Sequence, residues 1–154
     1  MRRRLGPAAQ GGQSLVEFAL VLPIFLLLLF GLIDIGRYVY TANAVNEAAR
    51  EGARLGSVAA WSTDCSGTRE ACVRDVALSR LAGVAIDAKD VTVQCWRYNL
   101  AKPAEPAPVP VSQCRSNDFL SVQLDAKFQV LTPVIGQFIG GAKVTGVAKV
   151  MVNQ

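Results

Sequence analysis

Residues 12–35 read GQSLVEFALVLPIFLLLLFGLIDI, and this stretch decides how the chain is organised. From Phe18 to Ile33 it contains no charged side chain. Extended back to Leu15 and on to Ile35, the apolar run reaches the ~20 residues that an α-helix needs to cross the hydrocarbon core of a bilayer. The sequence therefore predicts a transmembrane helix over about residues 15–35.

Three arginines, Arg2 to Arg4, precede the apolar run. Basic residues beside the first membrane helix favour the cytoplasmic side, so the chain after the helix is expected outside the cytoplasm. With 154 residues, the protein has room for one further domain. We expect an extracytoplasmic head over residues 57–154, anchored in the cytoplasmic membrane by a single pass.

Glu17 is a carboxylate within the apolar run, and it has two interpretations. At the centre of a membrane helix such a charge costs about 2.5–3.5 kcal/mol on insertion scales, and less near an end. In the first interpretation Glu17 lies at the interface, where the positive end of the helix dipole favours an anion. The second starts from Gly12. If the chain is cut between Gly12 and Gln13, the new α-amino group lies one helical turn from Glu17 and can pair with it between neighbouring subunits.

The sequence GQSLVEF (residues 12–18) resembles the processing site of type IV prepilins in its Tad (tight adherence) form. Residues 12–57 as a whole resemble the N-terminal signature of the TadE-like family, although Phe18 stands where Tad pilins often have Tyr. The resemblance implies that residues 1–12 are a leader, which a prepilin peptidase removes between Gly12 and Gln13. It also implies that Glu17 and Phe18 act in assembly.

The same resemblance implies a minor pilin or pseudopilin of a Tad surface pilus. Such a protein stays in the cytoplasmic membrane or enters the surface pilus, and its partners are the prepilin peptidase, other pilins and the pilus assembly machinery. By similarity, these filaments serve surface attachment and biofilm formation. One alternative is a single-pass anchored extracytoplasmic binding domain unrelated to pili. Another is an exported domain cut at Ala42-Asn43-Ala44, which has the A-x-A form of a signal peptidase site.

Beyond the apolar run the helical pattern continues, and we expect one helix over residues 13–56. Small residues recur at every fourth position, at Ala44, Ala48, Gly52 and Gly56. Such a face lets another element approach the helix closely. Pro23 removes one backbone donor inside the helix, so we expect a kink there.

The four cysteines all follow the apolar run. An even number in a translocated region indicates disulfides, and three pairings are possible. We favour the sequence-local pairs, Cys65–Cys72 and Cys95–Cys114. Closing the second loop contributes roughly 3 kcal/mol in the chain-entropy model. A zinc site of four thiolates is disfavoured because the cysteines lack the paired close spacing of such sites.

The head shows both helix and strand patterns. Alternating or β-branched strand patterns occupy residues 91–98, 120–130 and 143–152, and short helix patterns occupy residues 69–83 and 134–139. The proline-rich residues 102–112 are expected to form an exposed loop. These elements predict an α+β, pilin-like fold, in which the long transmembrane helix packs against a small antiparallel sheet.

Composition excludes several classes of function. The chain has no histidine, which excludes Ser-His-Asp and Cys-His catalysis and His-ligated metals. Without residues 1–12, Lys and Arg number 13 against 12 Asp and Glu, which leaves no strongly basic face for nucleic acid. No nucleophile, base or metal set is clustered in the sequence. We therefore expect a protein that is not an enzyme and has no cofactor, metal, small-molecule substrate or nucleic-acid partner.

Overall fold

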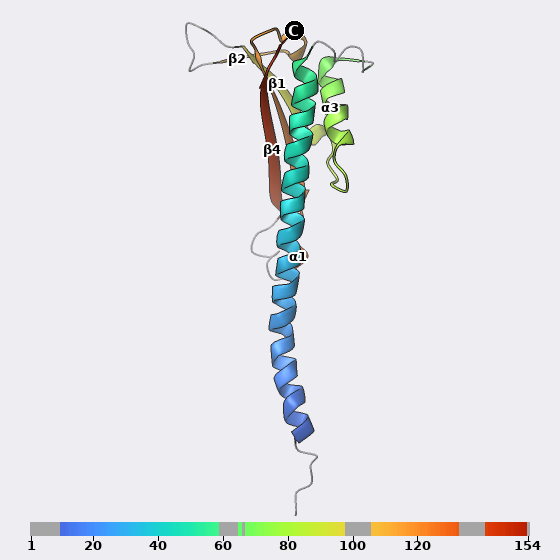
Figure 1. The fold of residues 1–154 in the computed structure, drawn as a ribbon, viewed down its shortest axis with the longest axis vertical. Helices are drawn as coiled ribbons and strands as arrows, with labels where there is room; N and C mark the ends of the chain where they lie inside the picture. The colour runs from blue at the N-terminus through green and yellow to red at the C-terminus, as the bar shows by residue number, and fades with distance from the viewer. Residues whose placement is uncertain (1–9, 59–64, 66, 98–105, 133–140, 154) are drawn as a thin grey trace, which may run out of the picture.

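The structure is a computed structural model that describes residues 10–58, 65, 67–97, 106–132 and 141–153. One long helix, α1 (Gln10–Ser57), carries a small head on its C-terminal half (Figure 1). The head contains α3 (Arg69–Ser79), the short 3-10 helices η2 (Ala88–Asp90) and η3 (Val111–Gln113), and the strands β1 (Val91–Arg97), β2 (Ala107–Val109), β3 (Phe119–Phe128) and β4 (Ala142–Met151). This is the predicted α+β arrangement of a long apolar helix on a small antiparallel sheet.

Helix α1 is 48 residues long and runs without a break past Pro23. It begins at Gln10, three residues before the start predicted at Gln13, so the described end of the predicted leader is helical. At about 1.5 Å per residue the helix extends ~72 Å. The leader over residues 1–12 and the kink at Pro23 stay predictions.

The sheet has the order β2-β1-β3-β4, and every neighbouring pair is antiparallel. Its longest pairing joins β3 to β4, from Phe119 opposite Met151 to Phe128 opposite Ala142. The fourth strand, β2, lies in the proline-rich stretch that was expected to be a loop, and that expectation was wrong. Proline cannot donate to a sheet, but β2 is an edge strand, where a missing donor is tolerated.

The inner face of the sheet packs on the C-terminal half of α1, and α3 packs on the same part of the helix. Ala48, Ala49 and Ala53 are fully buried there. A Cβ atom added at Gly56 would come within 2.7 Å of Val73, which shows how closely α3 approaches. The predicted small-residue face is therefore the packing face of α1.

Both predicted disulfides are formed, with Cα–Cα distances of 5.7 Å for Cys65–Cys72 and 5.9 Å for Cys95–Cys114. The first is attached to the first turn of α3, and the second joins β1 to the residue that follows η3. Because all four cysteines are bonded, none is left to bind zinc as a thiolate.

Two other boundaries differ from the prediction. Helix α3 ends at Ser79, not at residue 83, because the next residues turn back toward α1: the Tyr40 hydroxyl donates to the Ala82 carbonyl at 2.6 Å, and Gly83 has a φ of +74°. Strand β3 ends at Phe128, not at residue 130. The short helix predicted over residues 134–139 lies outside the described residues.

At Gly146, β4 packs directly on the backbone of α1. A Cβ atom there would lie 2.7 Å from the carbonyl carbon and oxygen of Val45, and helix backbone cannot move aside easily. We predict that Gly146→Ala lowers the free energy of unfolding by about 1–3 kcal/mol, as overpacking does. The measurement is denaturant unfolding of the full-length protein in detergent micelles. Gly141→Ala is the matched control, because nothing lies within 4 Å of that position. Equal stability of the two variants would contradict the packing of β4 on α1.

Candidate membrane and assembly segment

The N-terminal half of α1 stands free of the head (Figure 1). From Gly12 to Ile33 every residue is exposed except Leu22 and Gly31, which are half-buried. We call residues 12–33 the stem. Only 6% of the most apolar window of α1 is buried, whereas the core helix of a soluble protein would be mostly buried. At about 1.5 Å per residue the stem is ~33 Å long, close to the ~30 Å thickness of a bilayer core. Among the described helices, α1 is long and apolar enough to cross a membrane.

The stem is followed by Asp34, whose side chain is buried although the residues on both sides of it are exposed. One carboxylate oxygen accepts from the backbone N–H of Leu131 at 2.9 Å. The other accepts from the N–H and the hydroxyl of Thr132, at 3.0 and 2.6 Å. Hydrogen bonds to an ionised acceptor are about twice as strong as neutral ones. Asp34 therefore fixes the chain that follows β3 to α1, at the point where the head begins.

Aromatic and cationic contacts surround Asp34. The Arg37 guanidinium lies 5.6 Å from the centre of the Phe128 ring, and the Tyr38 ring meets that ring edge-on at 5.6 Å between centroids. Arg37 also donates to the Gln129 carbonyl at 3.4 Å. We call these residues, together with Asp34 and Thr132, the stem–head junction. In the sequence, Asp34 is visible only as a charge near the end of the apolar run, because its partner Thr132 is 98 residues away.

The predicted cleavage and assembly residues lie in the first turns of α1. Gly12, Gln13, Glu17 and Phe18 are all exposed. The helix brings Gln13 and Glu17 together as their spacing predicted, and the Gln13 side-chain amide donates to the Glu17 carboxylate at 3.2 Å. In the uncut chain, Glu17, the one charged residue of the stem, thus has a hydrogen-bond partner one helical turn away. The roles of these four residues in cleavage and assembly stay predictions.

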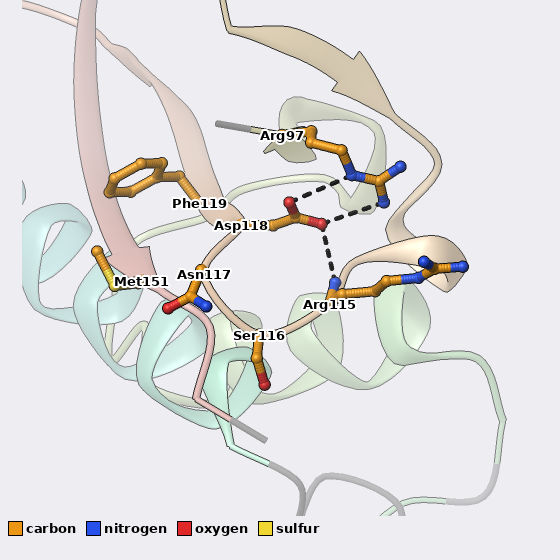
Figure 2. Close-up of a pocket in the computed structure, with 7 residues that line it drawn as sticks. All are labelled: Arg97, Arg115, Ser116, Asn117, Asp118, Phe119 and Met151. Carbon is orange, nitrogen blue, oxygen red and sulfur yellow. Dashed lines mark hydrogen bonds and ion pairs between the residues drawn. The ribbon is translucent and has the colours of Figure 1, made fainter. Parts of the chain in front are cut away.

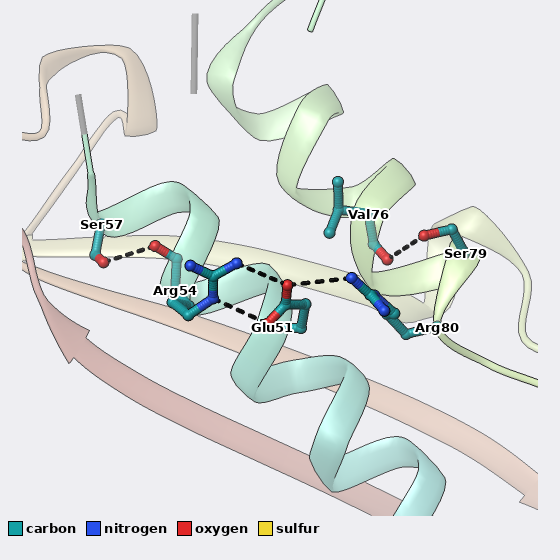
Figure 3. Close-up of polar contacts among 6 residues, drawn as sticks. All are labelled: Glu51, Arg54, Ser57, Val76, Ser79 and Arg80. Atoms are coloured by element: carbon teal, nitrogen blue, oxygen red, sulfur yellow. Dashed lines mark hydrogen bonds and ion pairs between the residues drawn. The ribbon is translucent and has the colours of Figure 1, made fainter. Parts of the chain in front are cut away.

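A charged cluster joins α1 to α3 at the opposite end of the helix (Figure 3). Glu51 accepts from Arg54 at 2.9 and 3.0 Å and from Arg80 of the α3 C-cap at 3.4 Å. The hydrogen bonds from Arg54 hold the pKa of the Glu51 carboxyl below its ordinary value. Ion pairs this exposed contribute little stability, so the cluster mainly orients α3.

A second polar cluster lies at the tip of the head, beside Met151 at the end of β4 (Figure 2). Buried Asp118 accepts from the Arg97 guanidinium at 3.3 and 3.4 Å and from the Arg115 backbone at 2.9 Å. Its carboxylate lies within 4.8 Å of the sulfurs of Cys95 and Cys114. Those sulfurs form a disulfide, so the group does not offer thiolate ligands to a metal.

The architecture is that of an α+β head carried on a long apolar helix with a free, membrane-length stem. A family model of the TadE-like proteins matches residues 12–54, which confirms the resemblance that the N-terminal sequence indicated. The matched residues are the stem and the packing face of α1, well under half of the chain. A search of curated proteins finds no match, and neither does a search of solved structures.

We predict that Asp34→Asn opens the stem–head junction. Asparagine keeps one acceptor oxygen but turns an NH₂ group toward a backbone donor, which leaves a buried N–H unsatisfied at about 1–3 kcal/mol. Amide hydrogen exchange at Leu131 and Thr132 should therefore be at least about fivefold faster in the variant. Glu47→Gln is the control, because Glu47 is an exposed residue of the same helix that forms no ion pair within the described chain. Unchanged exchange in Asp34→Asn would show that the carboxylate does not hold the junction.

Proposed function

We propose that the protein is a minor pilin or pseudopilin of a Tad surface pilus, acting in pilus assembly and surface attachment. The stem inserts in the cytoplasmic membrane with the head outside the cytoplasm. A prepilin peptidase cuts between Gly12 and Gln13, and the assembly machinery then passes the stem from the membrane into contact with other pilins. The role is structural and not catalytic.

The observation that carries the proposal is a stem that is apolar on all sides and holds one charged residue, Glu17. A helix that is apolar all round is stable only when something apolar covers it. Lipid covers the stem in the membrane, and the stems of neighbouring subunits would cover it in a filament. The match to the TadE-like family over residues 12–54 supports the same context.

Processing changes what Glu17 can pair with. In the uncut chain the Gln13 side chain already donates to Glu17. After cleavage Gln13 also carries a positive α-amino group, about one helical turn from Glu17. A cation and an anion at fixed positions in an apolar core are stabilised only when each has a partner. Pairing the amine of one subunit with Glu17 of the next would therefore set the axial offset between stems.

The stem–head junction argues against an exported domain cut at Ala42-Asn43-Ala44. Such a cut would remove Asp34, Arg37 and Tyr38, and with them every junction contact to residues 128–132. The junction is equally compatible with an anchored binding domain unrelated to pili. A substitution at Glu17 is therefore needed to distinguish that alternative from the pilin.

We predict that Glu17→Ala inserts normally but fails to assemble. Insertion should be unchanged or better, because the substitution removes a charge that membrane helices tolerate poorly. Incorporation into pili should fall tenfold or more, because the partner amine would be buried without a counter-ion, at a cost of several kcal/mol. The measurement is the amount of protein in membrane fractions and in sheared pilus fractions of the same cells.

Glu47→Ala is the matched control, since it removes the same charge from an exposed position of the same helix outside the stem. It should leave both fractions unchanged. An anchored binding domain predicts that Glu17→Ala behaves in the same way as this control. Normal assembly of Glu17→Ala would therefore refute the pairing mechanism.

A further inference from the structure

We propose that the membrane-proximal end of the head binds anionic phospholipid headgroups through Arg37, Lys127 and Lys143. This site goes beyond the pilin role. It rests only on the part of the proposed function that places the stem in a bilayer.

The three cations lie just beyond the end of the stem. Arg37 is one helical turn past Ile33, and its bond to the Gln129 carbonyl holds the end of β3 at the same level. Lys127 is two residues before Gln129, which places it about 7 Å farther from the stem along β3. Lys143 lies directly opposite Lys127 in the β3–β4 register. The headgroup layer adds ~5–8 Å to each side of a bilayer core, and long lysine side chains reach toward it.

Two of the three cations, Lys127 and Lys143, lack an ion-pair partner among the described residues. Both lysines are exposed. Like charges directly opposite each other on two strands destabilise the sheet. Asp125, on the same face of β3, accepts hydrogen bonds from the neutral Thr145 hydroxyl at 2.6 Å and from the Gln123 amide, and among the described residues it forms no ion pair with either lysine. An anion supplied from outside would relieve this repulsion.

Arg37 is also available to an external anion. Its side chain is 46% exposed, and its distance of 3.7 Å from the Asp34 carboxylate is long for an ion pair. The three shorter hydrogen bonds to that carboxylate come from neutral donors of Leu131 and Thr132, so Asp34 keeps its charge and compensates Arg37 in part.

A hollow connects two of the three cations. Its volume is about 350 Å³, and α1, β3 and the turn after α3 line it through Arg37, Thr41, Gly83, Val84, Ala85, Lys127, Phe128 and Gln129. None of these lining residues is acidic. The size suits a small polar group, and a lipid phosphate is the anion that the neighbouring bilayer would supply.

Two further cation-lined hollows among the described residues do not fit this role. The hollow between α1 and α3 contains Glu47 and Glu51, and Glu51 already binds two arginines (Figure 3). The hollow at the tip of the head has Asp118 bound to Arg97 and opens beside the end of β4, far from the stem (Figures 1 and 2).

The test uses the full-length protein in two kinds of nanodisc, one of phosphatidylcholine alone and one with roughly one phosphatidylglycerol for every two phosphatidylcholine molecules. An amine-acylating reagent labels the lysines, and mass spectrometry measures the rate at each one. We expect labelling of Lys127 and Lys143 to slow about fivefold in the anionic discs, the factor that corresponds to ~1 kcal/mol per cation near an anionic surface. Added salt should reverse the effect, and Lys149 should react equally in both discs.

A second experiment, with substituted proteins, tests whether the lipid binds to these residues. Native mass spectrometry of protein released from the anionic discs should show bound phosphatidylglycerol for the wild type and a loss of it for Lys127→Gln/Lys143→Gln. The control, Lys149→Gln/Arg115→Gln, makes the same change in net charge at exposed positions farther from the stem, and it should keep the lipid.

Several outcomes would overturn the proposal. Equal labelling in the two discs, or equal slowing at Lys149, would mean that no headgroup site exists here. Equal protection by inorganic phosphate in neutral discs would indicate an ion and not a lipid. Protection that rises with the number of protein copies in neutral discs would indicate a second chain. A protein that fails to insert would contradict the membrane stem itself, whereas one that inserts without protection contradicts only the headgroup site.

Discussion

The hydrogen bonds between Asp34 and Thr132 mark the boundary on which the structure depends. On the N-terminal side of Asp34, α1 is exposed over a length that matches a bilayer core. On the C-terminal side residues 35–40 are still exposed, and from Thr41 onward β3, β4 and α3 cover one face of the helix. A buried carboxylate is expensive unless its oxygens are satisfied, and here two backbone donors and a hydroxyl satisfy them. The arrangement fixes how much of α1 the head can cover, and therefore how much is left for lipid or for other stems.

Above this boundary the head is small, and it compensates by close packing and cross-links. Alanine and glycine on α1 let α3 and the sheet approach its backbone, and Gly146 does the same from β4. The first disulfide ties Cys65 to the start of α3, and the second lies in the core itself, where Cys95 and Cys114 are both buried. A domain of this size gains much from such cross-links, because its buried apolar area is limited.

The sequence was informative wherever the determining pattern is local. The apolar run, the spacing of alanine and glycine, and the alternation in residues 120–130 and 143–152 predicted α1, its packing face and two long strands. Sequence-local pairing also predicted both disulfides.

Strand β2 was missed because its prolines argue against a strand, and only the free edge of β1 makes one acceptable. The role of Asp34 could not be predicted, since nothing near it in the sequence indicates a partner 98 residues away. The assembly residues came from a motif; the structure adds only that Gln13 and Glu17 touch in the uncut chain.

The most direct measurement is the N-terminus of the natural protein, determined by mass spectrometry from membrane and pilus fractions. A processed pilin stem predicts a chain that begins at Gln13 in both fractions, with Glu17 one helical turn from the new amine. A chain that begins at Met1 in both fractions would show that Gly12 is not a cleavage site. A chain that begins at Val45 would show that the stem is a signal sequence, and it would contradict the pilin role entirely.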